Sequence, residues 1–388
     1  MQNADFLIEP QWVLPIAPNN TALTNHAVAV AAGTIVAVGP VEQLRARFAD
    51  SERIVRPTHA LLPGLVNAHV RAGGRLLRGL PVRGPRARWL RETLLPAEQR
   101  WMSAEFVREG TRLAAAEMLQ AGITCFADAS LFPEEGARIA ATAGIRAAIG
   151  LPVADGSNAW AADTTAHLAR GERVWDEYRA HPWVQPYFAP QAGADLSDAT
   201  LVRVRRVADE LDARVAMSVH ETDLEIRDSL AQHGRRPLQR LQALGLLQSG
   251  FTAIHMNRLD ASDLEIAAAT GVAVVTCPQA NLRLGSGCSV ARLSAAGLVC
   301  GLGSAEPAAC GALDILSEAR MAALIGANEP DGQALSAFSA LRMATLDGAA
   351  ALGLEARIGS LEPGKAADLV CVDIGSLACQ PDALAADA

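Results

Sequence analysis

Residues 103–128 read SAEFVREGTRLAAAEMLQAGITCFAD, and this stretch decides the fold class. Ser103 is a good helix N-cap and Gly122 suits the position just past a helix end, so we predict a helix over residues 103–120. The apolar run that follows, 123–128, predicts a strand that ends on an aspartate. A helix followed directly by a strand is the repeating unit of a parallel α/β sheet.

The same alternation continues along the chain. Short apolar runs predict further strands, and the longer alanine- and leucine-rich stretches between them predict helices. The predicted strands are 147–153, 184–189, 215–220, 252–255, 272–276 and 298–302, and the predicted helices include 198–211, 262–269 and 313–325. Eight strand–helix units in one domain indicate a closed barrel, so the predicted fold class is α/β, a (β/α)8 TIM-like barrel.

The sequence pattern at both ends of the chain differs from the strand–helix alternation of the middle. Residues 5–58 alternate short apolar stretches with Gly and Asn-Asn turns, which is typical of strands and turns. A lone strand pattern at 367–373 is predicted to pair with them. We therefore expect a small β-sandwich from residues 1–58 and 360–388, incomplete at its C-terminal side, and a barrel domain from residues 59–359.

Charge and cysteine content narrow the class of protein. The net charge of −8 argues against a nucleic-acid partner. Arginines cluster at 83, 86, 88 and 91, where a solvated helix or loop face is the expected role and an anion contact the alternative. Seven cysteines without a CxxC pair predict reduced thiols. With neither a signal-peptide pattern nor a membrane-length apolar run, we expect a soluble, cytoplasmic protein.

Polar residues follow four of the predicted strands, at the positions where barrel enzymes carry their chemistry. They lie in the stretches 67–71 (NAHVR), 218–222 (SVHET), 253–257 (AIHMN) and 301–306 (GLGSAE). Because the carboxyl ends of barrel strands meet at one mouth, we expect these side chains to face one another.

The chain resembles the amidohydrolase superfamily along nearly its whole length, and within it the deaminases of 5-methylthioadenosine and S-adenosylhomocysteine and the triazine chlorohydrolases. The resemblance is carried by LLPGLVNAH at 61–69, by the stretch LLPAEQRW to GITCF at 94–126, by CPQANLRLGSG at 277–287 and by IGSLEPGKAADLVCVD at 358–373. It implies a zinc or iron ion held by a His-x-His pair, a further His and an Asp. Such a metal lowers the pKa of its bound water, so that hydroxide can attack an aromatic C–NH₂ carbon.

When the family's four metal-ligand positions are mapped onto this chain residue by residue, most of them lack a metal-binding side chain. His69 keeps the first position, but the second falls on Arg71, whose protonated guanidinium has no lone pair to donate. The third position falls on Ser218 and the fourth on Ala305. Because zinc sites normally need three or four ligands, we expect a degraded metal site with no metal cofactor, and assign no residue as a metal ligand.

The proton-handling pair of the family is retained. The resemblance implies that Glu221 and His255 are the catalytic residues, and it places a substrate-facing histidine where this chain has Gln191. The predicted substrate-binding residues are His69, Arg71, Gln191, Ser218, His220, Ala305 and Glu306. The expected ligand is a purine-like or anionic small molecule.

Three hypotheses for the site stay open. A displaced metal site could use His69, His220, His255 and Glu306, since residues two apart on a strand share a face. A metal-free hydrolase, deaminase or lyase could use Glu221 and His255, with Arg71 as electrophile. A homologue without the standard deaminase activity, which we favour, could keep a ligand pocket, form a homo-oligomer, pair with an intact paralogue or, as a decaying product, have no role.

Arg71 is the most informative departure from the family pattern. It shares a strand face with His69, so an inward-facing His69 implies an inward-facing Arg71. We expect its guanidinium to pair with Glu221 or with a bound anion, because a buried arginine without such a partner is costly. The simpler alternatives are that Arg71 bends into solvent and that His69 is a structural histidine.

Overall fold

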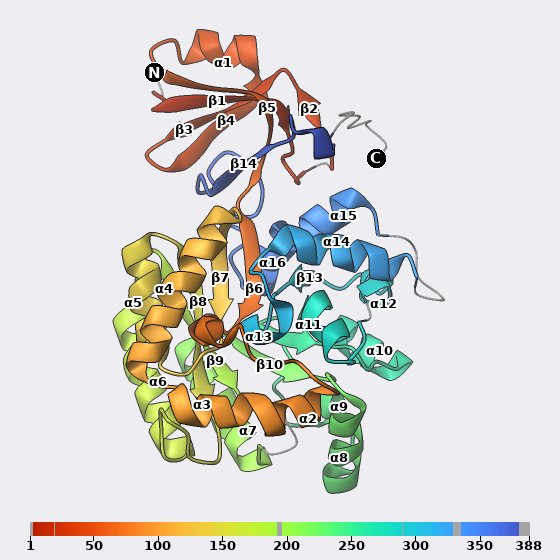
Figure 1. Cartoon of the computed structure of the whole chain (residues 1–388). Coiled ribbons are helices and arrows are strands. Elements are labelled where there is room, and N and C mark those ends of the chain that lie inside the picture. Colours follow the sequence, from red (N-terminus) through yellow and green to blue (C-terminus); the bar gives the residue numbers. More distant parts are fainter. Residues whose placement is uncertain (1–2, 19, 192–195, 289, 329–334, 380–388) are drawn as a thin grey trace.

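The computed structural model describes residues 3–379 apart from 19, 192–195, 289 and 329–334, and within them two sheets are formed (Figure 1). The larger sheet has eight parallel strands in chain order, from β6 to β13. These are β6 (Leu65–Val70), β7 (Ile123–Asp128), β8 (Arg146–Val153), β9 (Val184–Pro190), β10 (Val215–Val219), β11 (Phe251–His255), β12 (Ala273–Thr276) and β13 (Cys300–Leu302). A bridge between Val70 and Ala305 joins the first strand to the segment after the last. The predicted TIM-like barrel is confirmed.

Helices surround the barrel (Figure 1). They are α4 (Ala104–Gln120), α5 (Pro133–Ala143), α6 (Thr164–Tyr178), α7 (Asp198–Leu211), α8 (Asp223–His233), α9 (Pro237–Ala243), α10 (Ala261–Thr270), α11 (Pro278–Arg283), α12 (Val290–Ala295), α13 (Pro307–Cys310), α14 (Ile315–Gly326), α15 (Ala337–Met343) and α16 (Leu346–Ala351), with the 3₁₀ turn η1 (Ala72–Leu77) after β6. The side chain of Ser103 caps α4 by accepting the N–H of Phe106 over 3.1 Å. The predicted helix 198–211 is confirmed at both ends.

The barrel strands are buried on both faces, as parallel strands covered by helices must be. Large side chains such as Phe126, Phe188 and Phe251 pack outward against the helices. Small side chains, among them Ala68 and Ala127, fill the interior. The barrel is therefore a closely packed platform that presents its strand ends at the mouth.

The smaller sheet is built from both ends of the chain. Its strands are β1 (Phe6–Val13), β2 (Leu23–Thr24), β3 (His26–Ala31), β4 (Thr34–Pro40), β5 (Glu52–Pro63) and β14 (Leu369–Asp373), with α1 (Val41–Arg47) beside them and the short η3 (Leu377–Cys379) after β14. The predicted pairing of the late strand is confirmed, because β14 runs antiparallel to β5. β5 continues to residue 63, past the boundary expected after residue 58. Residues 380–388, on which the expected incompleteness depends, lie outside the described residues.

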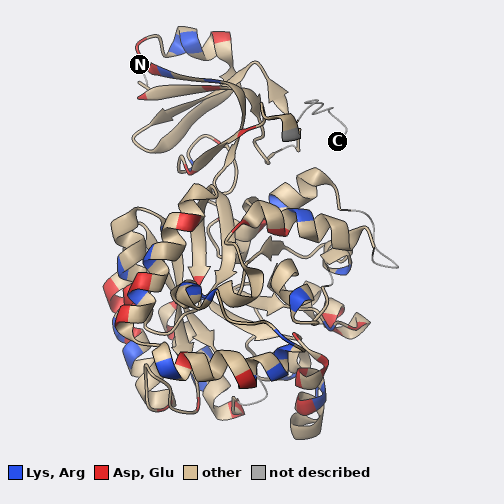
Figure 2. Ribbon diagram, viewed as in Figure 1, with Lys and Arg blue, Asp and Glu red and all other residues tan. Residues whose placement is uncertain are grey.

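Acidic and basic residues alternate along the helices around the barrel (Figure 2). All seven cysteines are free. Within the described ranges, none of the helices combines the length and the apolar character that crossing a membrane requires.

Candidate active site

A cavity of about 220 Å³ opens at the carboxyl mouth of the barrel. Of the nine predicted site residues, eight line it: His69, Arg71, Gln191, Ser218, Glu221, His255, Ala305 and Glu306. Their gathering follows from the parallel strands, which deliver their C-terminal residues to one end. The chemical role of each residue remains a prediction.

His69 lies at the end of β6 with 7% of its surface exposed. Its Nδ1 is buried and has no hydrogen-bond partner among the described residues. Burial lowers the pKa of His69 well below its usual value, and the nearby charges of Arg71 and Arg86 lower it further. His69 is therefore a neutral imidazole in the cavity wall.

Arg71 points into the mouth, as the strand alternation predicts, but its partners differ from the expected ones. Its Nη1 donates to Oε1 of Glu306 over 2.8 Å, and its Nη2 lies 3.1 Å from Oε1 of Glu98. The expected pairing with Glu221 is wrong. Although burial lowers the pKa of Arg71, the two carboxylates raise it by more, so the guanidinium stays charged.

Glu221 is paired instead with Arg86, whose Nε contacts Oε1 of the carboxylate. Burial raises the pKa of Glu221, but the charge and the hydrogen bond of Arg86 lower it, and the net shift is downward. Glu221 is thus an ionised carboxylate, held by a cation that the sequence pattern did not assign to the site.

His255 lies beside Glu221, with its Nε2 at 3.5 Å from Oε1 of the carboxylate. Its Nδ1 contacts Oδ1 of Asn281 at 2.8 Å, and Asn281 in turn donates to Oδ1 of Asn257. Because Oδ1 can only accept, Nδ1 carries the proton. Burial lowers the pKa of His255, so the ring is neutral. Its Nε2 therefore presents a lone pair to an ionised carboxylate, and no proton lies between the two groups.

Arg86 and Glu98 reach the cavity from a segment that crosses the mouth, which we call the mouth-covering segment, residues 86–101 (Figure 1). It consists of α2 (Arg86–Trp89), a π-helical turn η2 (Leu90–Leu94) and α3 (Leu95–Trp101). The solvated face expected for the arginine cluster holds for Arg88 and Arg91, but it is wrong for Arg86, whose side chain is 18% exposed. Burial and the neighbouring Glu306 raise the pKa of Glu98, while Arg71 opposes them.

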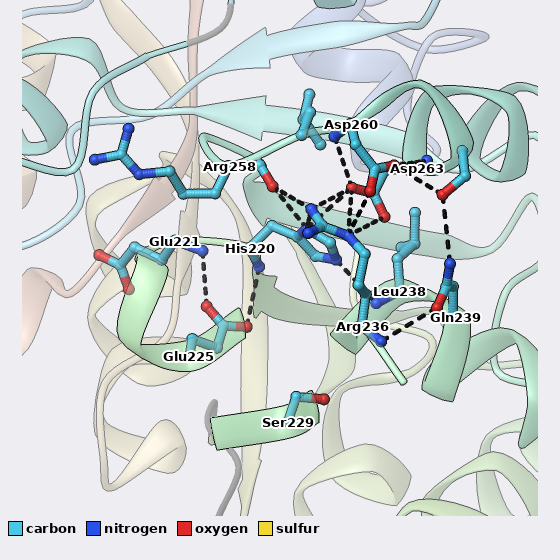
Figure 3. A network of polar contacts seen from close by, with 12 residues as sticks. His220, Glu221, Glu225, Ser229, Arg236, Leu238, Gln239, Arg258, Asp260 and Asp263 are labelled. Atoms are coloured by element: carbon cyan, nitrogen blue, oxygen red, sulfur yellow. Dashed lines mark hydrogen bonds and ion pairs between the residues drawn. The ribbon is translucent and has the colours of Figure 1, made fainter. Parts of the chain in front are cut away.

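His220 does not line the cavity, contrary to its predicted role in substrate binding. Its ring is fully buried, with Nδ1 at 3.0 Å from the carbonyl oxygen of Arg258 and Nε2 accepting the N–H of Leu238 (Figure 3). The lone pair of this imidazole is thus already used. The displaced metal site, which needs that lone pair, does not form in this arrangement.

The end of β10 is held by a polar network that the sequence pattern did not reveal (Figure 3). The carboxylate of Glu225 accepts the backbone N–H groups of His220 and Glu221 over 3.0 and 2.7 Å. Burial raises the pKa of Glu225 to about 7. Arg236 lies beside His220 and donates to Asp263 over 2.6 Å. These residues fix the position of Glu221 from behind the cavity.

An eight-stranded parallel barrel with polar side chains gathered at its carboxyl mouth defines the class of TIM-barrel proteins. Within that class the chain belongs to the amidohydrolase family, whose pattern matches residues 60–387. The predicted resemblance is confirmed.

Named relatives are similar over nearly the whole chain. The 5-methylthioadenosine/S-adenosylhomocysteine deaminase of Teredinibacter turnerae is 39% identical over 379 residues, covering 97% of this chain and 86% of that protein. A zinc-bound adenosine deaminase from Xanthomonas campestris matches with a TM-score of 0.95 at 43% identity, covering 98% of this chain and 87% of that one. A zinc-complexed atrazine chlorohydrolase from Arthrobacter aurescens shares the fold, with a TM-score of 0.88 at 24% identity over 96% and 88% of the two chains.

These comparisons correct the expectation of no cofactor, because the family is metal-dependent and both solved neighbours hold zinc. The residues present do not match that cofactor in the observed arrangement. Within the described part of the chain, no group of three His, Cys, Asp or Glu side chains lies together as a metal ion requires. Arg71 is ion-paired at the second ligand position and Ala305 has no donor atom at the fourth.

Proposed function

We propose that this chain is an amidohydrolase homologue that binds a purine-like small molecule in the barrel mouth and does not carry out the standard deaminase reaction. The observation that carries the proposal is the pair of guanidinium groups in the cavity. Arg71 is bound by Glu98 and Glu306, and Arg86 is bound to Glu221. The names of the relatives, which are deaminases of adenosine and its sulfur derivatives, support a purine-like ligand.

The state of the proton-handling pair supports the same proposal. Deamination needs a group that takes a proton from water and passes it to the leaving nitrogen. Glu221 is engaged by Arg86, and His255 turns an unprotonated nitrogen toward it. Both groups can accept a proton, so it is the ion pair that argues against turnover, because Arg86 holds the Glu221 carboxylate and lowers its pKa, which makes it a weaker base.

Ammonia release and ligand binding, measured side by side, test the proposal. Adenosine, 5-methylthioadenosine and S-adenosylhomocysteine are each incubated with the protein, with and without added zinc. We expect no release above that of Glu221→Gln, and binding of at least one nucleoside by calorimetry. Turnover that is lost in Glu221→Gln would contradict the proposal and support the alternative of an active C–N hydrolase at Glu221 and His255.

A further inference from the structure

The barrel mouth holds more negative than positive charge. Among the described residues that line it, the carboxylates of Glu98, Glu221 and Glu306 face the guanidinium groups of Arg71 and Arg86. All three carboxylates are mostly buried, with side-chain exposures of 12%, 9% and 11%. Three carboxyl groups thus share two guanidinium groups, and when all three are ionised and the histidines are neutral, the cavity carries one excess negative charge.

The ion pairs leave hydrogen-bond acceptors free for a ligand. Arg71 is shared, since Glu306 and Glu98 both contact it through their Oε1 atoms. Glu221 likewise uses Oε1 for Arg86 and His255. Among the described residues no hydrogen bond to the second oxygen of these carboxylates is found, so a ligand can donate to it. An anionic ligand, by contrast, would have to displace a carboxylate from an arginine.

His69 also lies in the cavity wall. Its side chain is more than nine-tenths buried, and its Nδ1 has no partner among the described residues. Because this atom is closed off from the cavity, a ligand can hydrogen-bond to it only after the imidazole turns.

Most of the remaining residues in the cavity wall are apolar, with Gln191, Ser218 and Asn281 as polar exceptions. Leu90 and Leu95 come from the mouth-covering segment, and Met217 and Ile254 come from the strand ends opposite. Apolar walls with a few convergent polar groups are the usual composition of a small-molecule site. The volume of about 220 Å³ is several times the roughly 30 Å³ of one water molecule, so it suits a small ring.

We infer that the ligand is a small organic cation, a flat ring bearing an amidinium group, a protonated amine or a protonated ring nitrogen. Its N–H groups donate to Glu98 and Glu306, and its ring lies against the apolar wall. The inference rests on the proposed function and deepens it, because it narrows a purine-like ligand to a cationic nitrogen heterocycle.

Three probes of nearly the same shape separate charge from size: benzamidine, benzamide and benzoate, which are cationic, neutral and anionic. Calorimetry near neutral pH is expected to show benzamidine binding about tenfold more tightly than benzamide, with benzoate weakest, since a charge-assisted hydrogen bond contributes at least 1.4 kcal/mol. Glu98→Gln should weaken benzamidine binding by about tenfold and leave benzamide binding almost unchanged. Glu92→Gln, on the same segment but paired with Arg88 at the surface, should change neither.

Glu306→Gln provides a second variant, and urea unfolding of both variants checks that the fold is intact. Tighter binding of benzoate, equal binding of the three probes, or binding of none would each overturn the inference. None of these results bears on turnover of adenosine or 5-methylthioadenosine. A cavity that prefers anions would therefore overturn the ligand class alone, whereas deamination would overturn the proposed function.

Discussion

The backbone N–H of Leu238 donates to Nε2 of His220 over 3.0 Å, which turns the lone pair of this imidazole away from the barrel mouth. Nδ1 then carries the proton and donates to the carbonyl oxygen of Arg258. The backbone of His220 is left-handed, with φ of 57°, a conformation that costs L residues about 1–2 kcal/mol. The residue is thus held by its surroundings as part of the frame behind Glu221.

We therefore predict that His220→Ala lowers the free energy of unfolding by about 3 kcal/mol, because it leaves buried backbone groups unpaired and opens a cavity. His220→Gly loses the same contacts but relieves the left-handed backbone, so it should be about 1 kcal/mol more stable than the alanine variant. Equilibrium unfolding in urea measures both differences. An alanine variant as stable as the wild type would show that the network around His220 has no role in the fold.

The second prediction concerns the pair of Arg86 and Glu221. Arg86→Met leaves the Glu221 carboxylate buried without its cation, and we expect a loss of about 3 kcal/mol in stability near neutral pH. Burial, the largest influence on this pKa, would then raise it instead of being outweighed. With a raised pKa, Glu221 binds its proton more tightly in the folded variant than in the unfolded chain. The free energy of unfolding of the variant should therefore fall as the pH rises above the ordinary pKa of glutamate. A carboxyl group with a lowered pKa would have the opposite effect.

The double variant Arg86→Met with Glu221→Gln serves as the control for this pair. It removes the charge that Arg86→Met leaves unpaired, so most of the lost stability should return. Urea unfolding at several pH values measures all four proteins. Additive losses in the double variant would show that the two residues are not coupled.

The parts of this structure that follow from local pattern could be predicted. The helix that begins after Ser103 and the strand that ends at Asp128 are set by capping and apolar period. The inward direction of Arg71 follows from strand alternation, since β6 carries His69 two residues earlier. The same alternation failed at His220, because β10 ends at Val219 and the next residue turns left-handed.

The partners of Arg71 and Glu221 could not be predicted. Arg86 and Glu98 lie between β6 and β7, and only the tertiary path of the mouth-covering segment brings them into the cavity. Arg86 and Arg88 are the same residue type two positions apart, yet the side chain of Arg86 is mostly buried and that of Arg88 is exposed. No local pattern separates them, because the choice is made by packing against the barrel.

The third prediction concerns Glu318, a buried carboxyl on α14. Its Oε2 accepts the N–H of Gln279 over 3.0 Å, and its Oε1 has no hydrogen-bond partner among the described residues. Burial, only partly offset by that hydrogen bond, raises the pKa of Glu318 from 4.5 to about 8. Between these values the folded protein binds more protons than the unfolded chain, so this group makes stability fall as the pH rises.

Glu318→Gln cannot ionise and should lack this dependence. Its stability relative to the wild type should rise with pH across that window, by up to about 1.4 kcal/mol per pH unit for one proton. Urea unfolding at a series of pH values measures the difference, with the exposed Glu109→Gln as control. A difference between Glu318→Gln and wild type that does not change with pH would show that Glu318 ionises at its ordinary pKa.

The last prediction concerns a variant in which the metal ligands that the family resemblance implies are restored around His69. Arg71→His, Ser218→His and Ala305→Asp are combined, since all three positions line the cavity and the N–H of Arg71 already donates to the carbonyl oxygen of Ala305. With zinc added, we expect deamination of adenosine or 5-methylthioadenosine to exceed that of the wild type by about a hundredfold or more, because Glu221 and His255 are retained. Arg71→His alone supplies too few donors and should remain inactive. A second rebuilt protein carries Arg86→Met in addition to the three substitutions, so that Glu221 is no longer paired with Arg86. If neither rebuilt protein gains activity, or if the wild type with zinc is equally active, the missing donors are not what separates this chain from its relatives.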